Sequence, residues 1–177
     1  MVIQMRRKDR EIKEFDEIID VLSRCKVLHL ALISNEKPYA VPVNFGFIVR
    51  ESDGQKKLSI YIHGAGEGKK LDAIKANPQV SFCAETSVEA SGPESAPEDA
   101  CKWTCFYESV IGFGTASLVA LVEDSKERTA GLDSIMLHNG YKMPSGIKTI
   151  AYNAMALAHT AVIKIEVDEI TGKRHLK

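Results

Sequence analysis

The chain has 177 residues, the usual size of one domain, and can bury roughly 70% of the surface that its unfolded form would expose. Hydrophobic residues make up 45% and charged residues 27%, which excludes a disordered or low-complexity protein. The 23 basic and 24 acidic side chains nearly cancel, so the chain lacks the basic surplus of a dedicated nucleic-acid binder. We expect no nucleic-acid partner.

The N-terminus, the apolar runs and the cysteines indicate where the protein resides. The basic residues among the first ten have no apolar segment behind them, so they do not form a secretory signal, and a cytoplasmic location is expected. The apolar run at residues 150–158 is too short to span a membrane. Free thiols with a packing role are expected for all the cysteines, and no metal site is predicted. These cysteines are Cys25, Cys83, Cys101 and Cys105.

The first half of the chain predicts a helix followed by an antiparallel meander. Residues 15–25 place apolar side chains at helical spacing, with charged side chains on the opposite face. Alternating or apolar segments separated by polar turns follow, and the second turn contains Asp53-Gly54. The expected strands cover residues 27–33, 38–49 and 58–63.

The second half mixes strands and helices. A short helix over 69–76 is ended by Asn77-Pro78, and the Pro- and Ser-rich residues 87–100 are expected to form an exposed loop insertion. Gly112 and Gly114 predict a bend or bulge where another backbone or a ligand comes close. The remaining expected elements are strands over 80–84, 103–119 and 160–167 and helices over 124–138 and 148–157, with a capping box at 124–127 and a fraying tail after 171.

This order of elements predicts a mainly β protein with α-helices. Six or more antiparallel strands with helices inserted between them favour a small barrel with short helices packed outside. We expect one domain over residues 1–177, with residues 1–12 as an N-terminal arm.

The segment from Tyr61 to Lys70 is the strongest candidate for a binding site. A strand ending at His63 is followed by three glycines and then by Lys69 and Lys70 at a helix start. Backbone amides, the helix N-terminus and two ammonium groups would all favour an anion such as a phosphate. The alternative is a flexible surface turn with two solvated lysines.

A second candidate lies at residues 41–44. Pro42 has no N–H to donate to a ladder, so this stretch should lie at a sheet edge or a bulge. Free backbone polar groups there would suit a flat heteroaromatic ring with N–H and carbonyl edges. The alternative is that Pro42 only protects an edge from pairing.

These segments, together with four others, resemble the 5-nitroimidazole resistance proteins, a family within the pyridoxamine 5'-phosphate oxidase-like group of FMN-binding split barrels. The resemblance runs in order from about Met5 to Lys173. The motifs that carry it are residues 5–12, 38–46, 63–71, 77–80, 101–104 and 109–114.

The resemblance implies a split barrel that forms a homodimer with two flavin sites between the subunits. The flavin ring would lie against residues 41–44, the phosphate would lie at Lys69 and Lys70, and the partner subunit would contribute the region of Trp103 and Ser109. Many split barrels carry an amide or acidic side chain where this chain has Ser109, so the family contact there is in question. The predicted cofactor-binding residues are Val41, Pro42, Val43, Asn44, Tyr61, His63, Lys69, Lys70, Trp103 and Ser109.

The activity that the resemblance implies is an FMN-dependent reductase, linked to NAD(P)H or another donor, that reduces a nitro-aromatic compound. Tyr61 and Trp103 would form aromatic walls, and His63 would supply a proton near neutral pH. The alternatives are a strand-capping role for His63, FAD in place of FMN, and a flavin- or haem-binding module that stores or senses a cofactor without turnover. His29, on an apolar strand, is interpreted as a core or interface histidine.

Overall fold

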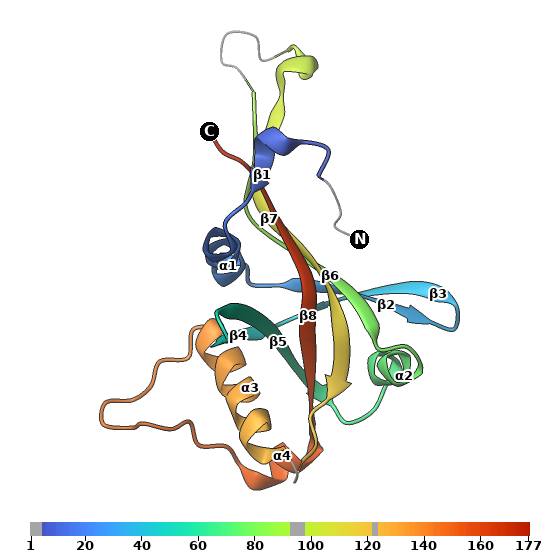
Figure 1. The fold of residues 1–177 in the computed structure, drawn as a ribbon, viewed down its shortest axis with the longest axis vertical. Coiled ribbons are helices and arrows are strands. Elements are labelled where there is room, and N and C mark those ends of the chain that lie inside the picture. Colours follow the sequence, from blue (N-terminus) through green and yellow to red (C-terminus); the bar gives the residue numbers. More distant parts are fainter. Residues whose placement is uncertain (1–4, 93–97, 122–123) are drawn as a thin grey trace.

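The computed structural model describes residues 5–92, 98–121 and 124–177. Its strands form one antiparallel sheet: β1 (Glu11–Ile12), β2 (Leu28–Ser34), β3 (Lys37–Val43), β4 (Gly46–Ser52), β5 (Gln55–Ala65), β6 (Gln79–Ser91), β7 (Thr104–Leu118) and β8 (Thr160–His175). Its helices are η1 (Lys8–Arg10), α1 (Phe15–Arg24), α2 (Lys69–Ala76), η2 (Ala100–Lys102), α3 (Ser125–His138) and α4 (Ala154–His159). Figure 1 shows the helices outside the curved sheet.

The order of the strands shows how the sheet curls. The order is β3-β2-β6-β7-β8-β5-β4, with β1 added to β8. β3 and β4 lie at opposite ends of this order, although only Asn44 and Phe45 separate them along the chain. The sheet must therefore bend until its two edges meet at this short connection, while no ladder joins the edges among the described residues. The expected split antiparallel β-barrel is confirmed.

The core fills the inside of this curved sheet. Strand side chains alternate between the two faces, and the inward set is aliphatic in β2, β5 and β8. Fully burying one such side chain contributes about 1.5–3 kcal/mol. The inward residues include Leu28, Leu30, Leu32, Ile60, Ile62, Ile163 and Ile165, and Ile18, Val21 and Leu22 of α1 pack against the same core.

The glycines of β7 behave as the sequence indicates. A Cβ at Gly112 would overlap the Phe82 ring, and a Cβ at Gly114 would overlap the carbonyl of Glu166. The register between β7 and β8 shifts between Phe113 and Gly114, which is the predicted bulge. Because these two positions lack a side chain, β6, β7 and β8 can pack closely against one another.

Helix α3 lies directly on β4 and β5 through two further glycines. A Cβ at Gly46 would overlap the backbone of Ser134 and Ile135, and a Cβ at Gly131 would overlap the ring of Tyr61. Without these side chains the helix backbone can approach the sheet closely. This packing fixes the position of α3, which lines the cavity described below.

Replacing Gly46 by alanine should lower the free energy of unfolding by about 1–3 kcal/mol, because the added methyl group overpacks the contact with α3. Denaturant unfolding measures this loss. Gly66→Ala is the matched control, since a Cβ there would meet only the His159 carbonyl, at 3.8 Å. Equal stability of the Gly46→Ala variant and the wild type would show that α3 shifts without cost.

Several local predictions are confirmed. The helix over 69–76 is observed with those bounds, and the first helix ends one residue earlier than predicted, at Arg24. The Asp53-Gly54 turn forms with a positive φ at both residues, as a two-residue hairpin turn requires. β3 is an edge strand, as Pro42 indicates.

Other predicted boundaries are wrong. The helix over 148–157 is replaced by α4, which begins at Ala154 because the Asn153 side chain accepts hydrogen bonds from the N–H groups of Met155 and Ala156. The segment 38–49 is split into β3 and β4. Asp124 is the N-cap of α3 without a side-chain capping bond, so the predicted capping box does not form.

The ends of the predicted loop and tail also differ. Residues 87–91 belong to β6, so this part of the predicted loop is a strand. Its register shifts between Thr86 and Glu89 and Ser87 has a positive φ, and this bulge hides the alternation. Residues 93–97 of the predicted loop lie outside the described residues. β8 continues to His175, because residues 173–175 pair with β7, and the tail does not fray.

The predicted N-terminal arm is only partly separate from the sheet. Residues 1–4 lie outside the described residues. Glu11 and Ile12 form β1 on the edge of β8, and Ile12 is 3% exposed. The arm is thus anchored to its own chain by β1.

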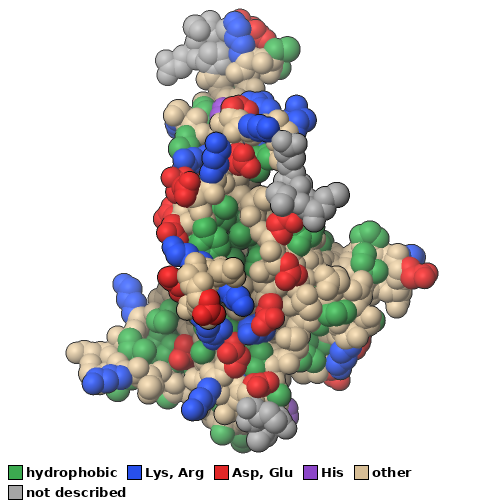
Figure 2. Space-filling model, viewed as in Figure 1, with side chains coloured by type: hydrophobic (Ala, Val, Ile, Leu, Met, Phe, Trp, Pro, Cys, Tyr) green, Lys and Arg blue, Asp and Glu red, His purple; other side chains and the backbone are tan. Residues whose placement is uncertain are grey.

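The surface of the molecule carries charge of both signs. Figure 2 shows acidic and basic side chains interspersed over the viewed face, in keeping with a net charge of -1. No helix in the described part of the chain is long and apolar enough to cross a membrane.

Candidate functional site

The turn between β5 and α2 forms a positively charged cradle. Gly68 is the N-cap of α2 with φ +119°, a conformation that favours glycine. The N–H groups of Leu71 and Asp72 donate to the Gly68 carbonyl. The helix therefore presents its first amides and the positive end of its dipole to the outside, at the point where Lys69 and Lys70 begin.

The two lysines extend from this helix start to different strands. Lys70 Nζ lies 3.3 Å from the position that a Gly64 Cβ would occupy, so its ammonium group lies over the backbone of β5. Lys69 Nζ lies 4.3 Å from the centroid of the Tyr39 ring in β3, a cation–π distance. Partial burial lowers the pKa of Lys70. Within the described residues, no carboxylate lies in ion-pair range of either ammonium group, so the cradle is open to an external anion.

His63 connects this cradle to a neighbouring cavity. Partial burial and, secondly, the charge of Lys70 lower the pKa of His63, which disfavours the charged imidazolium form. Its side chain still reaches solvent. The cavity that it borders has a volume of about 200 Å³ and is lined mainly by apolar residues of α3 and α4. The lining residues include Leu132, Ile135, Met136, Tyr152, Ala156 and Leu157.

Tyr152 also lines this cavity, which the sequence did not reveal. Tyr152 donates a hydrogen bond to Asp133 Oδ1 at 2.7 Å, and burial raises the pKa of its phenol well above the usual value. This bond ties the segment before α4 to α3. The only sequence signal was an isolated aromatic residue, which does not show where the segment folds.

The predicted ring-binding stretch lies beside the cradle on β3. Val41 and Val43 pack toward the core, whereas Pro42 pairs with His29 on the opposite face. Asn44 donates a side-chain hydrogen bond to Asn139 Oδ1 at 3.3 Å. Among the described strands β3 pairs with β2 alone, so its other edge is open.

Tyr61 lies apart from this region. Its side chain is fully buried under α3 and donates a hydrogen bond to Glu127, while Arg50 donates to its hydroxyl group at 3.4 Å. Burial and the bond to Glu127 raise its pKa. Contrary to the prediction, the ring of Tyr61 packs between sheet and helix and is not a wall of an open site.

Trp103 and Ser109 lie toward the other end of the molecule. Trp103 is 51% exposed and follows η2, at the tip of the β6–β7 hairpin. The end of β7 nearest to α2 is marked by Thr115, which pairs with Gln79 just after that helix. Thr104, the residue after Trp103, begins the same strand and lies roughly 35 Å from Thr115, at about 3.3 Å per residue. Ser109 lines a separate surface hollow of about 320 Å³. Within one chain, the structure does not bring these residues to Lys69 and Lys70.

Comparison with known proteins identifies relatives of this fold. A family model described as pyridoxamine 5'-phosphate oxidase matches residues 14–174. No curated protein matches the chain.

Three solved structures share the architecture. A 5-nitroimidazole antibiotic resistance protein from Bacteroides thetaiotaomicron is 24% identical, with a TM-score of 0.68 and coverage of 93% of this chain and 86% of that chain. The flavocytochrome Anf3 from Azotobacter vinelandii is 19% identical, with a TM-score of 0.68 and coverage of 98% and 73%. An FAD and heme binding protein from Mycobacterium smegmatis is 18% identical, with a TM-score of 0.70 and coverage of 95% and 74%. At these identities the similarity shows the shared fold.

Proposed function

Because this chain belongs to the pyridoxamine 5'-phosphate oxidase family, we propose that it is a flavin-dependent oxidoreductase that binds FMN and reduces nitro-aromatic compounds. The observation that carries the proposal is the open cradle of Lys69 and Lys70 beside His63 and an apolar cavity. The names of the structural neighbours, which include a 5-nitroimidazole resistance protein and two proteins with flavin or haem, agree with this reading.

The cradle fits a phosphate monoester. A phosphate would be stabilised by the two ammonium groups and by the first amides of α2. A Cβ at Gly68 would meet nothing within 4 Å, so the approach to these amides is open. FAD remains the alternative to FMN, because it requires only additional room beyond the phosphate.

The ring of the cofactor would lie toward β3. Lys69 extends to Tyr39 in this strand, so a group held by the cradle lies near the open edge formed by residues 41–44. Free backbone N–H and carbonyl groups at that edge would bond the polar rim of the ring. When bound, the flavin would supply two-electron transfer, and the protein would orient it and restrict water.

His63 would deliver a proton to the acceptor. Conversion of a nitro group to a nitroso group takes up two electrons and two protons and releases water. A reduced nicotinamide supplies a hydride, which is two electrons and one proton, so one further proton must come from the protein or solvent. His63 borders the apolar cavity and contacts solvent, so it would relay this proton: one ring nitrogen would accept a proton from water while the other releases its proton to the acceptor.

A second copy of the chain would complete the site. The outer face of the sheet exposes large apolar side chains, with Ile33 43%, Ile111 48% and Phe113 38% exposed. Such a face is suited to contact with another subunit. A homodimer through this face would let Trp103 and Ser109 of one subunit approach the cradle of the other, which they do not reach in their own chain.

Anaerobic reduction of a 5-nitroimidazole by the FMN-loaded protein tests the proposal. With NADH or NADPH in excess, the nitro absorbance should fall over many turnovers per protein. His63→Gln should retain FMN and lose about 10²- to 10⁴-fold in turnover, the usual contribution of a positioned acid or base.

The outcomes separate the two functions that the fold suggests. Flavin that stays oxidised under excess NADH and NADPH, or is reduced without consumption of the nitro compound, would contradict the reductase and favour storage or sensing. A protein that takes up haem but no flavin would contradict the proposal altogether. Undiminished turnover in His63→Gln would remove only the role of His63.

A further inference from the structure

Three side chains with metal-binding donors meet on the outer face of β2 and β6. His29 and Cys83 are paired directly across the two strands, and Glu85 follows Cys83 by two residues on the same face. All three therefore project outward from the sheet. The flanking residues that face inward and are buried are Leu28, Leu30, Phe82 and Ala84.

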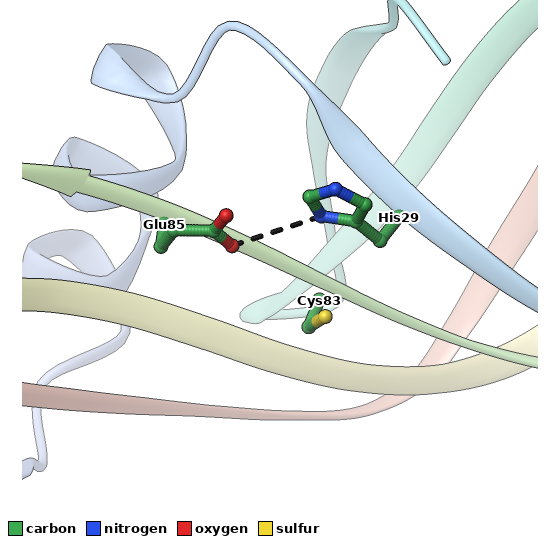
Figure 3. A group of neighbouring side chains, drawn as sticks. All are labelled: His29, Cys83 and Glu85. Atoms are coloured by element: carbon green, nitrogen blue, oxygen red, sulfur yellow. Dashed lines mark ion pairs between the residues drawn. The ribbon is translucent and has the colours of Figure 1, made fainter. Parts of the chain in front are cut away.

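The donors are close enough to share one ion. One donor atom from each residue lies within 4.8 Å of the other two, and His29 Nδ1 lies 3.7 Å from a Glu85 carboxylate oxygen. Figure 3 shows the imidazole and the carboxylate pointing toward each other over the strand that carries Cys83. Tetrahedral zinc with bonds of about 2.1 Å to nitrogen and oxygen separates two such ligands by roughly 3.4 Å. Small side-chain rotations would satisfy this geometry.

We propose that His29, Cys83 and Glu85 bind a divalent cation of the zinc type, with water as the fourth ligand. Imidazole, thiolate and carboxylate are the donors that zinc uses, whereas Mg²⁺ and Ca²⁺ require mostly oxygen ligands. The thiolate and the carboxylate together balance the charge of the cation. Three protein ligands leave the fourth position to water, as in a reactive zinc site rather than a closed structural one.

The Cys83 thiol must lose its proton to bind a cation. Burial and, secondly, the nearby Glu85 carboxylate raise the pKa of the Cys83 thiol, so it is protonated at neutral pH when no cation is bound. A zinc ion would displace this proton. Without a cation, the cluster would reduce to a surface contact between His29 and Glu85, with side chains 42% and 46% exposed.

The cluster lies next to the stretch and the face used in the proposed flavin site, since His29 pairs with Pro42 and Cys83 pairs with Ile111. β6 is separated in the sheet from β5, which carries His63, by β7 and β8. The cluster and the cradle of Lys69 and Lys70 use different side chains, so titrations with Zn²⁺ and with FMN test the two proposals separately.

Competitive titration of the metal-free full chain with Zn²⁺ against a chromophoric chelator tests the site. We expect one Zn²⁺ per chain, with no uptake of Mg²⁺ at the same concentration. Cys83→Ser and His29→Gln should each weaken zinc binding by at least about a hundredfold, since even groups that only orient metal ligands change affinity by roughly 10- to 100-fold. Cys105→Ser is the matched control, because this exposed thiol lies outside the cluster. The Cys105→Ser variant should bind Zn²⁺ with the affinity of the wild type.

Substitution of Co²⁺ reports the ligands directly. The wild type should show a thiolate-to-cobalt charge-transfer band, which Cys83→Ser should lose and Cys105→Ser should keep. Circular dichroism confirms that each variant is folded. Zinc affinity in the wild type no higher than in the His29→Gln/Cys83→Ser double variant, or a charge-transfer band that persists in Cys83→Ser, would overturn the assignment.

Discussion

FMN binding should weaken about a hundredfold or more when Lys69 and Lys70 are both replaced by alanine. Each charge-assisted contact to a phosphate is worth about 1.5–3 kcal/mol, and two such contacts reach this factor together. The described residues offer no carboxylate that would neutralise either lysine, so both charges are available to a ligand. Quenching of flavin fluorescence on titration gives the dissociation constant.

Riboflavin makes this experiment specific for the phosphate. The wild type should bind FMN roughly a hundredfold more tightly than riboflavin, which has the same ring and no phosphate. In the double variant the two affinities should become similar, because only the FMN affinity falls. Lys13→Ala/Lys75→Ala is the control with the same change in net charge, at two exposed positions that lie before α1 and in the last turn of α2.

An unchanged ratio of FMN to riboflavin affinity in the double variant would contradict the phosphate assignment. A matching loss for both flavins would instead place the lysines against the ring. The thermal midpoint of the variant checks that the partly buried Lys70 is not required for folding.

The cradle could be predicted from the sequence because its parts are contiguous. The glycines, Lys69, Lys70 and the helix end at Asn77-Pro78 all lie within one short segment, so local rules of turn and helix formation apply. The hairpin turn at Asp53-Gly54 could be predicted for the same reason, because the Asp-Gly pair itself favours the positive φ angles that the turn requires. Only the direction taken by each lysine, toward Tyr39 or over Gly64, required the tertiary structure.

Tyr61 shows why alternation alone does not locate a site. It shares a face of β5 with His63, so both residues have the same pattern in the sequence. Helix α3 covers Tyr61 through Gly131, whereas His63 borders the cavity between α3 and α4. Which part of a strand a helix covers depends on long-range packing, so the sequence could not separate a buried tyrosine from a site histidine.

The cluster of His29, Cys83 and Glu85 depends on register in the same way. His29 and Cys83 meet only because β2 pairs with β6, two strands that are far apart in the chain. Taken singly, His29 was best explained as a core or interface histidine and Cys83 as a packing thiol. Long-range pairing also explains the missed ends of β6 and β8, since a bulge and a basic tail gave no local sign of a strand.

Arg128 is expected to be the most important single residue for the stability of the α3–α4 region. Its side chain is 6% exposed, and Nη2 donates to the Leu157 carbonyl at 2.7 Å and to the Thr160 carbonyl. The first carbonyl lies in the last turn of α4, where the helix dipole favours a cation. The second is at the first residue of β8. The guanidinium group thus holds together the end of the short helix, the start of β8 and α3.

Arg128→Met should lower the free energy of unfolding by about 2–4 kcal/mol. Two hydrogen bonds from a charged donor contribute about 1.5–3 kcal/mol each, and release of a buried guanidinium whose Nε has no partner among the described residues offsets part of this. Denaturant unfolding measures the loss, and Lys126→Met on the exposed side of α3 is the control. Hydrogen exchange should quicken most at residues 157–160, which border the cavity at His63. An Arg128→Met protein as stable as the wild type, with unchanged exchange there, would show that α4 is held by its apolar contacts instead.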